Sequence, residues 1–148
     1  MYTSLCSGCY YFNTSAMNQT EARTTCGRIN GSLVEIETWE EQEALAAEAR
    51  ERNNTNYGFW IGLKYEEDSW VWEQSGEEAA FTAWAPGKPS QEYPCAIIWV
   101  FRMNNGTWTN QGCATRSGPA SLSFGAICEL QLGRSIEIVY YYFYHLNR

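Results

Sequence analysis

Six cysteines constrain the fold of this 148-residue chain more than any other feature of its sequence. Their even number and wide spacing are typical of disulfide bridges, which form and persist in oxidising compartments. A zinc site is a poor alternative, because the chain has one His and one Cys-x-x-C, from Cys6 to Cys9, and lacks the further ligands. The sequence therefore predicts a disulfide-stapled domain that is secreted and extracellular.

Five acceptor sequences for N-linked glycosylation point to the same compartment. Each consists of Asn, a residue other than Pro, and Ser or Thr, and the acceptors are Asn13, Asn18, Asn30, Asn53 and Asn105. Half of the chain's Asn residues lie in such sequences, which exceeds what random placement of Ser and Thr gives. We therefore expect a glycoprotein, with Asn53 and Asn105 in polar turns as the best acceptors. An ordinary polar loop composition is the alternative.

Composition and charge narrow the class of protein. A chain of 148 residues builds one domain with a real core. Its net charge of −7, without a basic run, disfavours nucleic acid and anionic membranes as partners, and no apolar run is long enough for a membrane span. His145 is the only His and lies near the end of the chain, so no catalytic set with His can be built from central residues. We expect a binding protein that is not an enzyme.

Helical patterns come before strand patterns along the chain, which predicts an α+β fold. Helices are expected at 18–28 and 39–52, the second beginning at a capping box formed by Thr38 and Glu41. Strands are expected at 59–63, 70–72 (after an acidic turn at 66–68), 95–103, 107–110 and 125–130. Residues 74–94 hold three of the four Pro and form a long loop, and loops of this length in compact domains are usually functional.

The order of these patterns resembles the C-type lectin-like domain over residues 9–129. The residues that carry the resemblance are Cys9-Tyr10-Tyr11-Phe12, Glu21-Ala22, Cys26, Leu33-Val34-Glu35-Ile36, Trp60-Ile61-Gly62-Leu63, Trp72, Gly76, Phe81, Trp84-Ala85-Pro86-Gly87, Cys95, Trp108, Cys113 and Ile127-Cys128-Glu129. Each is a weak signal alone, but all of them occur in register. The resemblance implies a domain over 1–130 with two helices, small antiparallel sheets and a long loop region.

The resemblance also implies two disulfide bridges, Cys26–Cys128 and Cys95–Cys113. The first would join the first helix to the last strand, and the second would close the base of the long loop. Cys6 and Cys9 are left over, with only two residues between them. We expect them to form a local bridge across a tight turn; a bridge to a second chain is the alternative.

Sugar-binding members of this family hold calcium in the long loop, and the residues at the matching positions here are poor ligands. The family uses Glu-Pro-Asn or Gln-Pro-Asp where this chain has Lys88-Pro89-Ser90, and Trp-Asn-Asp where it has Trp108-Thr109-Asn110. Calcium prefers several oxygen ligands, many of them carboxylates, and Lys88 brings an ammonium group instead. Glu92 alone does not make a site. We therefore expect no calcium in this loop, while Pro89 is expected to keep a cis peptide bond.

The long-loop face is the expected binding surface. Its candidate residues are Lys88, Ser90, Glu92, Trp99, Trp108 and Asn110. The function expected from them is recognition of an extracellular protein or glycan without calcium, and no cofactor is expected. A peripheral structural calcium at Glu41 and Glu129, where some family members hold one, is the lesser alternative.

Residues 131–148 extend past the part of the chain that resembles the family and are rich in strand-forming residues. Alternate positions place Ile136, Ile138, Tyr140, Tyr142 and Tyr144 on one strand face. The strand is expected either to join the sheet of its own domain or to pair with another subunit. The second possibility predicts a homo-oligomer or filament, and hence a structural or fibre-forming protein as the alternative function.

Overall fold

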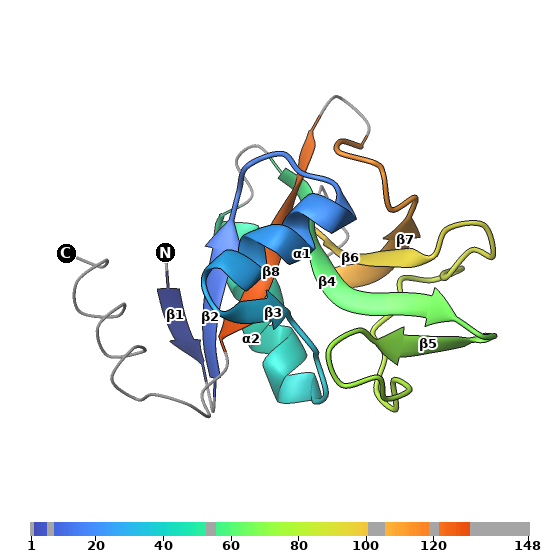
Figure 1. Ribbon diagram of the computed structural model, residues 1–148. Coiled ribbons are helices and arrows are strands. Elements are labelled where there is room, and N and C mark those ends of the chain that lie inside the picture. Colours follow the sequence, from blue (N-terminus) through green and yellow to red (C-terminus); the bar gives the residue numbers. More distant parts are fainter. Residues whose placement is uncertain (1, 6–7, 53–55, 101–105, 119–121, 131–148) are drawn as a thin grey trace.

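The computed structural model of the chain describes residues 2–5, 8–52, 56–100, 106–118 and 122–130 (Figure 1). The elements in chain order are β1 (Tyr2–Leu5), β2 (Gly8–Asn13), α1 (Gln19–Arg28), β3 (Gly31–Leu33), α2 (Trp39–Glu51), β4 (Asn56–Glu66), β5 (Ser69–Trp72), β6 (Cys95–Trp99), β7 (Thr107–Gln111) and β8 (Ser123–Leu130). The expected α+β class is confirmed. No helix among the described residues is long and apolar enough to cross a membrane.

Both helices begin at a side-chain cap, and the sequence predicts the one at Thr38. The side chain of Asn18 accepts a hydrogen bond from the backbone N–H of Glu21 at 2.9 Å, which starts α1. Thr38 does the same for Glu41 at 3.1 Å and starts α2. The carboxylate of Glu41 reaches back to the N–H of Glu37 at 3.0 Å, one position before the N–H that a capping box uses.

The strands form one connected sheet in the order β1-β2-β8-β4-β6-β7, with β3 paired to β8 and β5 paired to β4. This differs from the small antiparallel sheets of the sequence analysis, because β4 and β8 pair in parallel and link the two halves. A parallel pair needs a long crossover, and the chain between the two strands supplies one. In Figure 1, β1 and β2 lie at one end of the sheet, and β5 lies at the other with the long segment that leads to β6.

Two disulfide bridges hold this arrangement, as the resemblance implies. Cys26–Cys128 joins α1 to β8, and Cys95–Cys113 joins the start of β6 to the residues after β7. In the chain-entropy model, a closed loop of 102 residues contributes about 4 to 5 kcal/mol to the free energy of unfolding and one of 18 residues about 3 kcal/mol. The second bridge anchors the segment on which the candidate site lies.

The structure differs from the expected local bridge at Cys9. Cys9 pairs with Ser4 in the β1–β2 ladder and has a buried, free thiol. Burial raises the pKa of this thiol, which lowers the share of reactive thiolate. Cys6 lies outside the described residues, as do Asn53, Asn105 and the whole of 131–148, so the expectations that rest on them stay predictions.

Candidate functional site

The segment between β5 and β6 is tied to the sheet by backbone hydrogen bonds. The N–H of Ala79 donates to the carbonyl of Trp70 at 2.9 Å, next to β5. Further along, the N–H of Ala85 donates to the carbonyl of Trp108 at 2.8 Å, and the N–H of Trp108 donates to the carbonyl of Ala83 at 2.8 Å. These bonds satisfy buried backbone groups that an irregular segment would otherwise leave without partners. The long loop is therefore a fixed part of the fold at these points.

A series of aromatic rings leads from the core to the surface of this region. Trp108 is fully buried, and its indole N–H donates to the side chain of Gln42 on α2 at 2.7 Å. The ring centroid of Trp84 lies 5.8 Å from that of Trp108. Trp70 follows at 4.7 Å from Trp84, and Tyr65 follows at 5.4 Å from Trp70. Aromatic pairs at such distances are attractive. The outermost ring, Tyr65, is 41% exposed and so rests on a stack that is anchored in the core.

The side chain of Asn110 holds the last part of the long loop. It is 1% exposed, and its Oδ1 accepts a hydrogen bond from the N–H of Ser90 at 3.0 Å. Its Nδ2 donates to the carbonyls of Ser90 and Tyr93, both at 2.6 Å. A buried amide has two donors and one acceptor oxygen, and here all of them have partners. One side chain of β7 therefore fixes the backbone of the loop at two positions.

These features surround a cleft of about 630 Å³, which we call the long-loop cleft. It is lined by Tyr65, Trp70 and residues 89–94. Its volume falls in the range of small-ligand sites, about 300 to 1,000 Å³. The rings of Tyr65 and Tyr93 are 41% and 43% exposed and supply apolar faces, while Gln91 and Glu92 supply polar groups. The cleft is therefore suited to a ligand that presents both apolar and hydroxyl-bearing surfaces.

Comparison with known proteins identifies the fold that carries this cleft. The family profile described as "Lectin C-type domain" matches residues 15–120. The chain belongs to the C-type lectin domain family. The match includes both helices, both cysteines of the bridge at the base of the long loop and the whole long-loop cleft.

Individual relatives agree with this assignment. Asialoglycoprotein receptor 1 of Rattus norvegicus is 28% identical over 136 residues, which are 86% of this chain and 42% of that protein. The low affinity immunoglobulin epsilon Fc receptor of Homo sapiens is 31% identical over 115 residues, 74% of this chain and 33% of that protein. The chain thus spans less than half the length of either receptor. The Ca2+-independent C-type lectin SPL-2 from Saxidomus purpuratus shares the fold, with a TM-score of 0.77, 21% identity, and coverage of 89% of this chain and 92% of that one.

The long loop of this lectin domain does not fit a calcium ion. Lys88 stands where an oxygen ligand is needed, and the Lys88–Pro89 peptide bond is cis, as expected. The oxygen of Asn110 is engaged with Ser90. In the described part of the chain, no three side chains of His, Cys, Asp or Glu come together to hold a metal. Calcium needs several converging oxygens, and beside Lys88 this part of the loop offers the single carboxylate of Glu92.

Acidic side chains gather at the N-terminal end of α2, where Glu129 of β8 lies near Glu35, Glu37 and Glu41; we call them the acidic cluster. Burial raises the pKa of Glu129 from its ordinary 4.5 to about 7, the backbone N–H of Glu35 partly offsets this, and the charges of Glu41, Glu35 and Glu37 raise it further. That N–H donates to the Glu129 carboxylate at 3.2 Å. The hydroxyl of Tyr10 donates to Glu41 at 2.7 Å.

The structure brings together only some of the residues that the sequence analysis selected. Ser90 and Asn110 contact one another, and Ser90 and Glu92 line the cleft. Lys88 comes just before the cleft residues in the chain, in the turn that begins at Ala85. Trp108 is a core residue, and Trp99 packs against Tyr57 at 5.7 Å, so neither lines the cleft.

Sequence reasoning missed Tyr65, Trp70 and Tyr93. The first two flank the acidic turn between β4 and β5, which brings them to the same end of the hairpin, where their positions pair. Glu67 and Asp68 form this turn with φ of 47° and 65°, the left-handed pair of a two-residue hairpin. Recognising the hairpin register would have placed both rings on one face.

Three of the five glycosylation acceptors lie in the described residues. Asn13 ends β2, and its side chain accepts a hydrogen bond from the N–H of Ser15 at 2.9 Å. Asn18 caps α1 through its oxygen, so its amide nitrogen takes no part in the cap. Asn30 is exposed after the end of α1, with a φ of 59°. Asn30 is therefore the most open of the three.

Proposed function

We propose that this C-type lectin domain is an extracellular binding module that holds a glycan in the long-loop cleft without calcium. The observation that carries the proposal is the buried amide of Asn110, whose donors and acceptor oxygen are all bonded to loop backbone. A bound ion would otherwise have to order this loop. With the loop already held by protein groups, binding needs no metal.

The chemistry of the cleft favours a glycan as the ligand. Sugar rings have apolar C–H faces and a rim of hydroxyl groups, so they need aromatic surfaces beside polar partners. Tyr65 and Tyr93 offer the exposed rings, and Glu92 offers an acceptor at the edge. The name of the Saxidomus relative, a calcium-independent lectin, supports the same reading. A protein ligand is the competing outcome.

The direct test is a screen of the full chain on a glycan array in the presence of excess EDTA. We expect binding to at least one glycan, weakened about tenfold or more, or about 1.4 kcal/mol, by Tyr65→Ala and by Tyr93→Ala. Trp39→Ala is the matched control, because Trp39 is exposed on α2 and does not line the cleft. No binding to any glycan, or equal losses in all three variants, would remove the glycan proposal.

Secretion, glycosylation and self-assembly belong to the same proposal. The bridges and the five acceptor sequences support an oxidising, glycosylating route. Assembly through residues 135–144 rests on sequence alone. Deleting residues 133–148 should leave a folded monomer. Sedimentation of the full-length chain and of the shortened chain at high concentration would test this prediction. A strictly monomeric full-length chain would end the assembly hypothesis.

A further inference from the structure

A second hollow, of about 450 Å³, lies away from the long-loop cleft and shares no lining residue with it. Three elements form it, and we call it the α1–β3 groove. Its polar lining consists of Thr20, Arg23 and Thr24 from α1, Ser32 from β3, and Glu73 and Gln74 from the turn after β5. This volume falls in the range of small-ligand sites, about 300 to 1,000 Å³.

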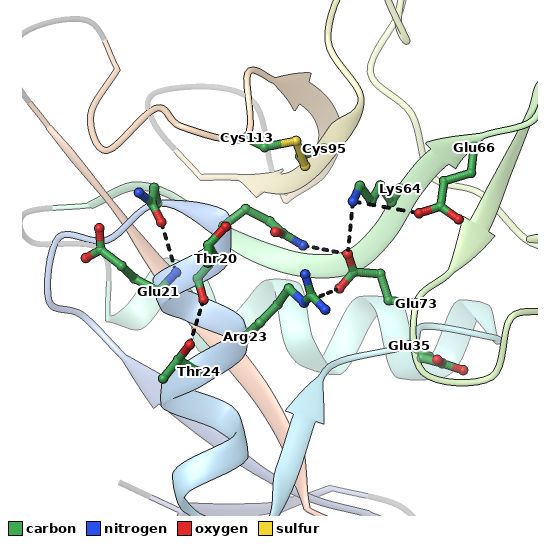
Figure 2. A network of polar contacts seen from close by, with 12 residues as sticks. Thr20, Glu21, Arg23, Thr24, Glu35, Lys64, Glu66, Glu73, Cys95 and Cys113 are labelled. Atoms are coloured by element: carbon green, nitrogen blue, oxygen red, sulfur yellow. Dashed lines mark hydrogen bonds and ion pairs between the residues drawn. A yellow bond between two sulfur atoms is a disulfide. The ribbon is translucent and has the colours of Figure 1, made fainter.

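Glu73 is the fixed centre of the groove. Its side chain is 17% exposed, and three groups from two elements hold its carboxylate. The amide of the buried Gln19 donates to it at 2.8 Å. Figure 2 shows Arg23 from α1 and Lys64 from β4 converging on the same carboxylate, with nitrogen to oxygen distances of 3.3 Å and 3.9 Å. Because these contacts come from groups set in helix and sheet, the carboxylate is positioned before any ligand arrives.

Arg23 presents donors beside this acceptor. Its contact with Glu73 is made through Nε, and a guanidinium has four more N–H donors in the same plane. The side chain is 53% exposed, so these donors are within reach of a ligand. Thr20, Arg23 and Thr24 are three and four positions apart and therefore share one face of α1. The groove thus offers a carboxylate, a guanidinium and hydroxyl groups side by side.

The basic and acidic side chains at the groove offset one another, and this favours an uncharged ligand. Among the lining residues Arg23 is matched by Glu73, and beside the groove Lys64 lies 3.9 Å from Glu73 and 3.7 Å from Glu66. A phosphate or sulfate would be repelled by the Glu73 carboxylate, and a cation would be repelled by the Arg23 guanidinium. A sugar with neighbouring hydroxyls can donate to the carboxylate and accept from the guanidinium without breaking the pair.

We infer that the α1–β3 groove is a second saccharide site, specific for a neutral sugar unit with adjacent hydroxyl groups. A smaller hollow of about 200 Å³ also borders the Arg23–Glu73 pair and includes Lys64 and Gly76. It shares Arg23 and Glu73 with the groove. The ion pair therefore sits between two spaces, and the second accepts a neighbouring sugar unit.

The test is a titration of the full, isotopically labelled chain with the methyl glycosides of mannose, galactose, glucose and N-acetylglucosamine in excess EDTA, followed by amide chemical shifts. We expect at least one glycoside to move the amide signals of Thr24, Ser32 and Gln74 with its own saturation curve. Arg23→Ala should weaken this binding about tenfold or more. Arg28→Ala, which removes the same charge from the last turn of α1, should leave it unchanged.

Thr24→Val provides a second variant, because it removes one hydroxyl at constant shape from an exposed position. It should also weaken the binding. The inference is overturned if no glycoside moves these signals, or if Arg23→Ala and Thr24→Val both bind as the unchanged chain does. Tyr93→Ala separates the two sites, since it should abolish shifts at residues 89–94 and leave those of the groove intact.

Discussion

A neutral amide holds the long loop, whereas the acidic cluster gathers carboxylates that form no ion pair with a basic side chain among the described residues. Asn110 bonds two backbone carbonyls and one N–H of the loop. Glu129 faces Glu35, Glu37 and Glu41, and its carboxyl is hard to ionise. Hydrogen bonds between neutral groups hold a buried segment at every pH. In a cluster of carboxylates, by contrast, the free energy of unfolding depends on how many of them are protonated. These two regions of the lectin domain should therefore respond differently to mutation, pH and calcium.

The largest effect is expected at Asn110. Asn110→Ala leaves the carbonyls of Ser90 and Tyr93 and the N–H of Ser90 without their partner, which should cost about 2 to 4 kcal/mol of the free energy of unfolding. Urea denaturation measures the loss. Gln111→Ala, at the next and half-buried position of β7, is the control. An Asn110→Ala loss no larger than that of the control would show that the amide does not hold the loop.

The effect at Glu129 should be smaller and should depend on pH. The folded carboxyl binds its proton more tightly than the unfolded one, with a pKa of about 7 against 4.5. The free energy of unfolding should therefore fall as the pH rises from about 4.5 to about 7. Glu129→Gln should raise it by about 1 to 3 kcal/mol at pH 8 and hardly change it at pH 4.

Denaturation of both proteins across this pH range checks the profile. The variant keeps an oxygen that can accept the N–H of Glu35, so the change isolates the charge. Glu43→Gln, an exposed position of α2, serves as the matched control. A stability profile that is flat between pH 5 and pH 8 in the unchanged chain would contradict the account of the acidic cluster.

The sequence predicts those features that depend on residues close together in the chain, or on positions that match the pattern of the family. The Thr38 cap depends on residues within one turn of helix, and it formed as expected. The two bridges and the cis bond before Pro89 followed from the family resemblance. Lys88 also predicts, from sequence alone, that the loop is a poor calcium site.

The role of Asn110 could not be predicted in this way. Its partners lie 17 and 20 positions earlier in an irregular segment, and their carbonyls belong to backbone that any sequence has. Trp99 and Trp108 were misplaced for a related reason. An aromatic residue near a loop suits either a core or a surface, and only the packing of Trp108 on Gln42 and of Trp99 on Tyr57 decides between them.

The smallest effect is expected from calcium. An ion that fills a site at a hundred times its Kd stabilises a protein by about 2.7 kcal/mol. We expect no shift in Tm between calcium and EDTA, because the loop is poor in ligands. In the described residues, the carboxylates of the acidic cluster also do not converge as three side chains that could hold a metal ion. A calcium-induced rise that Glu129→Gln abolishes would instead assign a structural ion to the acidic cluster and leave the long loop unaffected.

The most direct test of the central claim, that Asn110 does in this loop what calcium would otherwise do, is glycan affinity measured by calorimetry in calcium and in excess EDTA. The best ligand from the array is titrated into the unchanged chain and into Asn110→Ala. We predict the same Kd with and without calcium for the unchanged chain, and weaker binding for Asn110→Ala in both conditions. Binding that disappears in EDTA and returns with calcium would contradict the account.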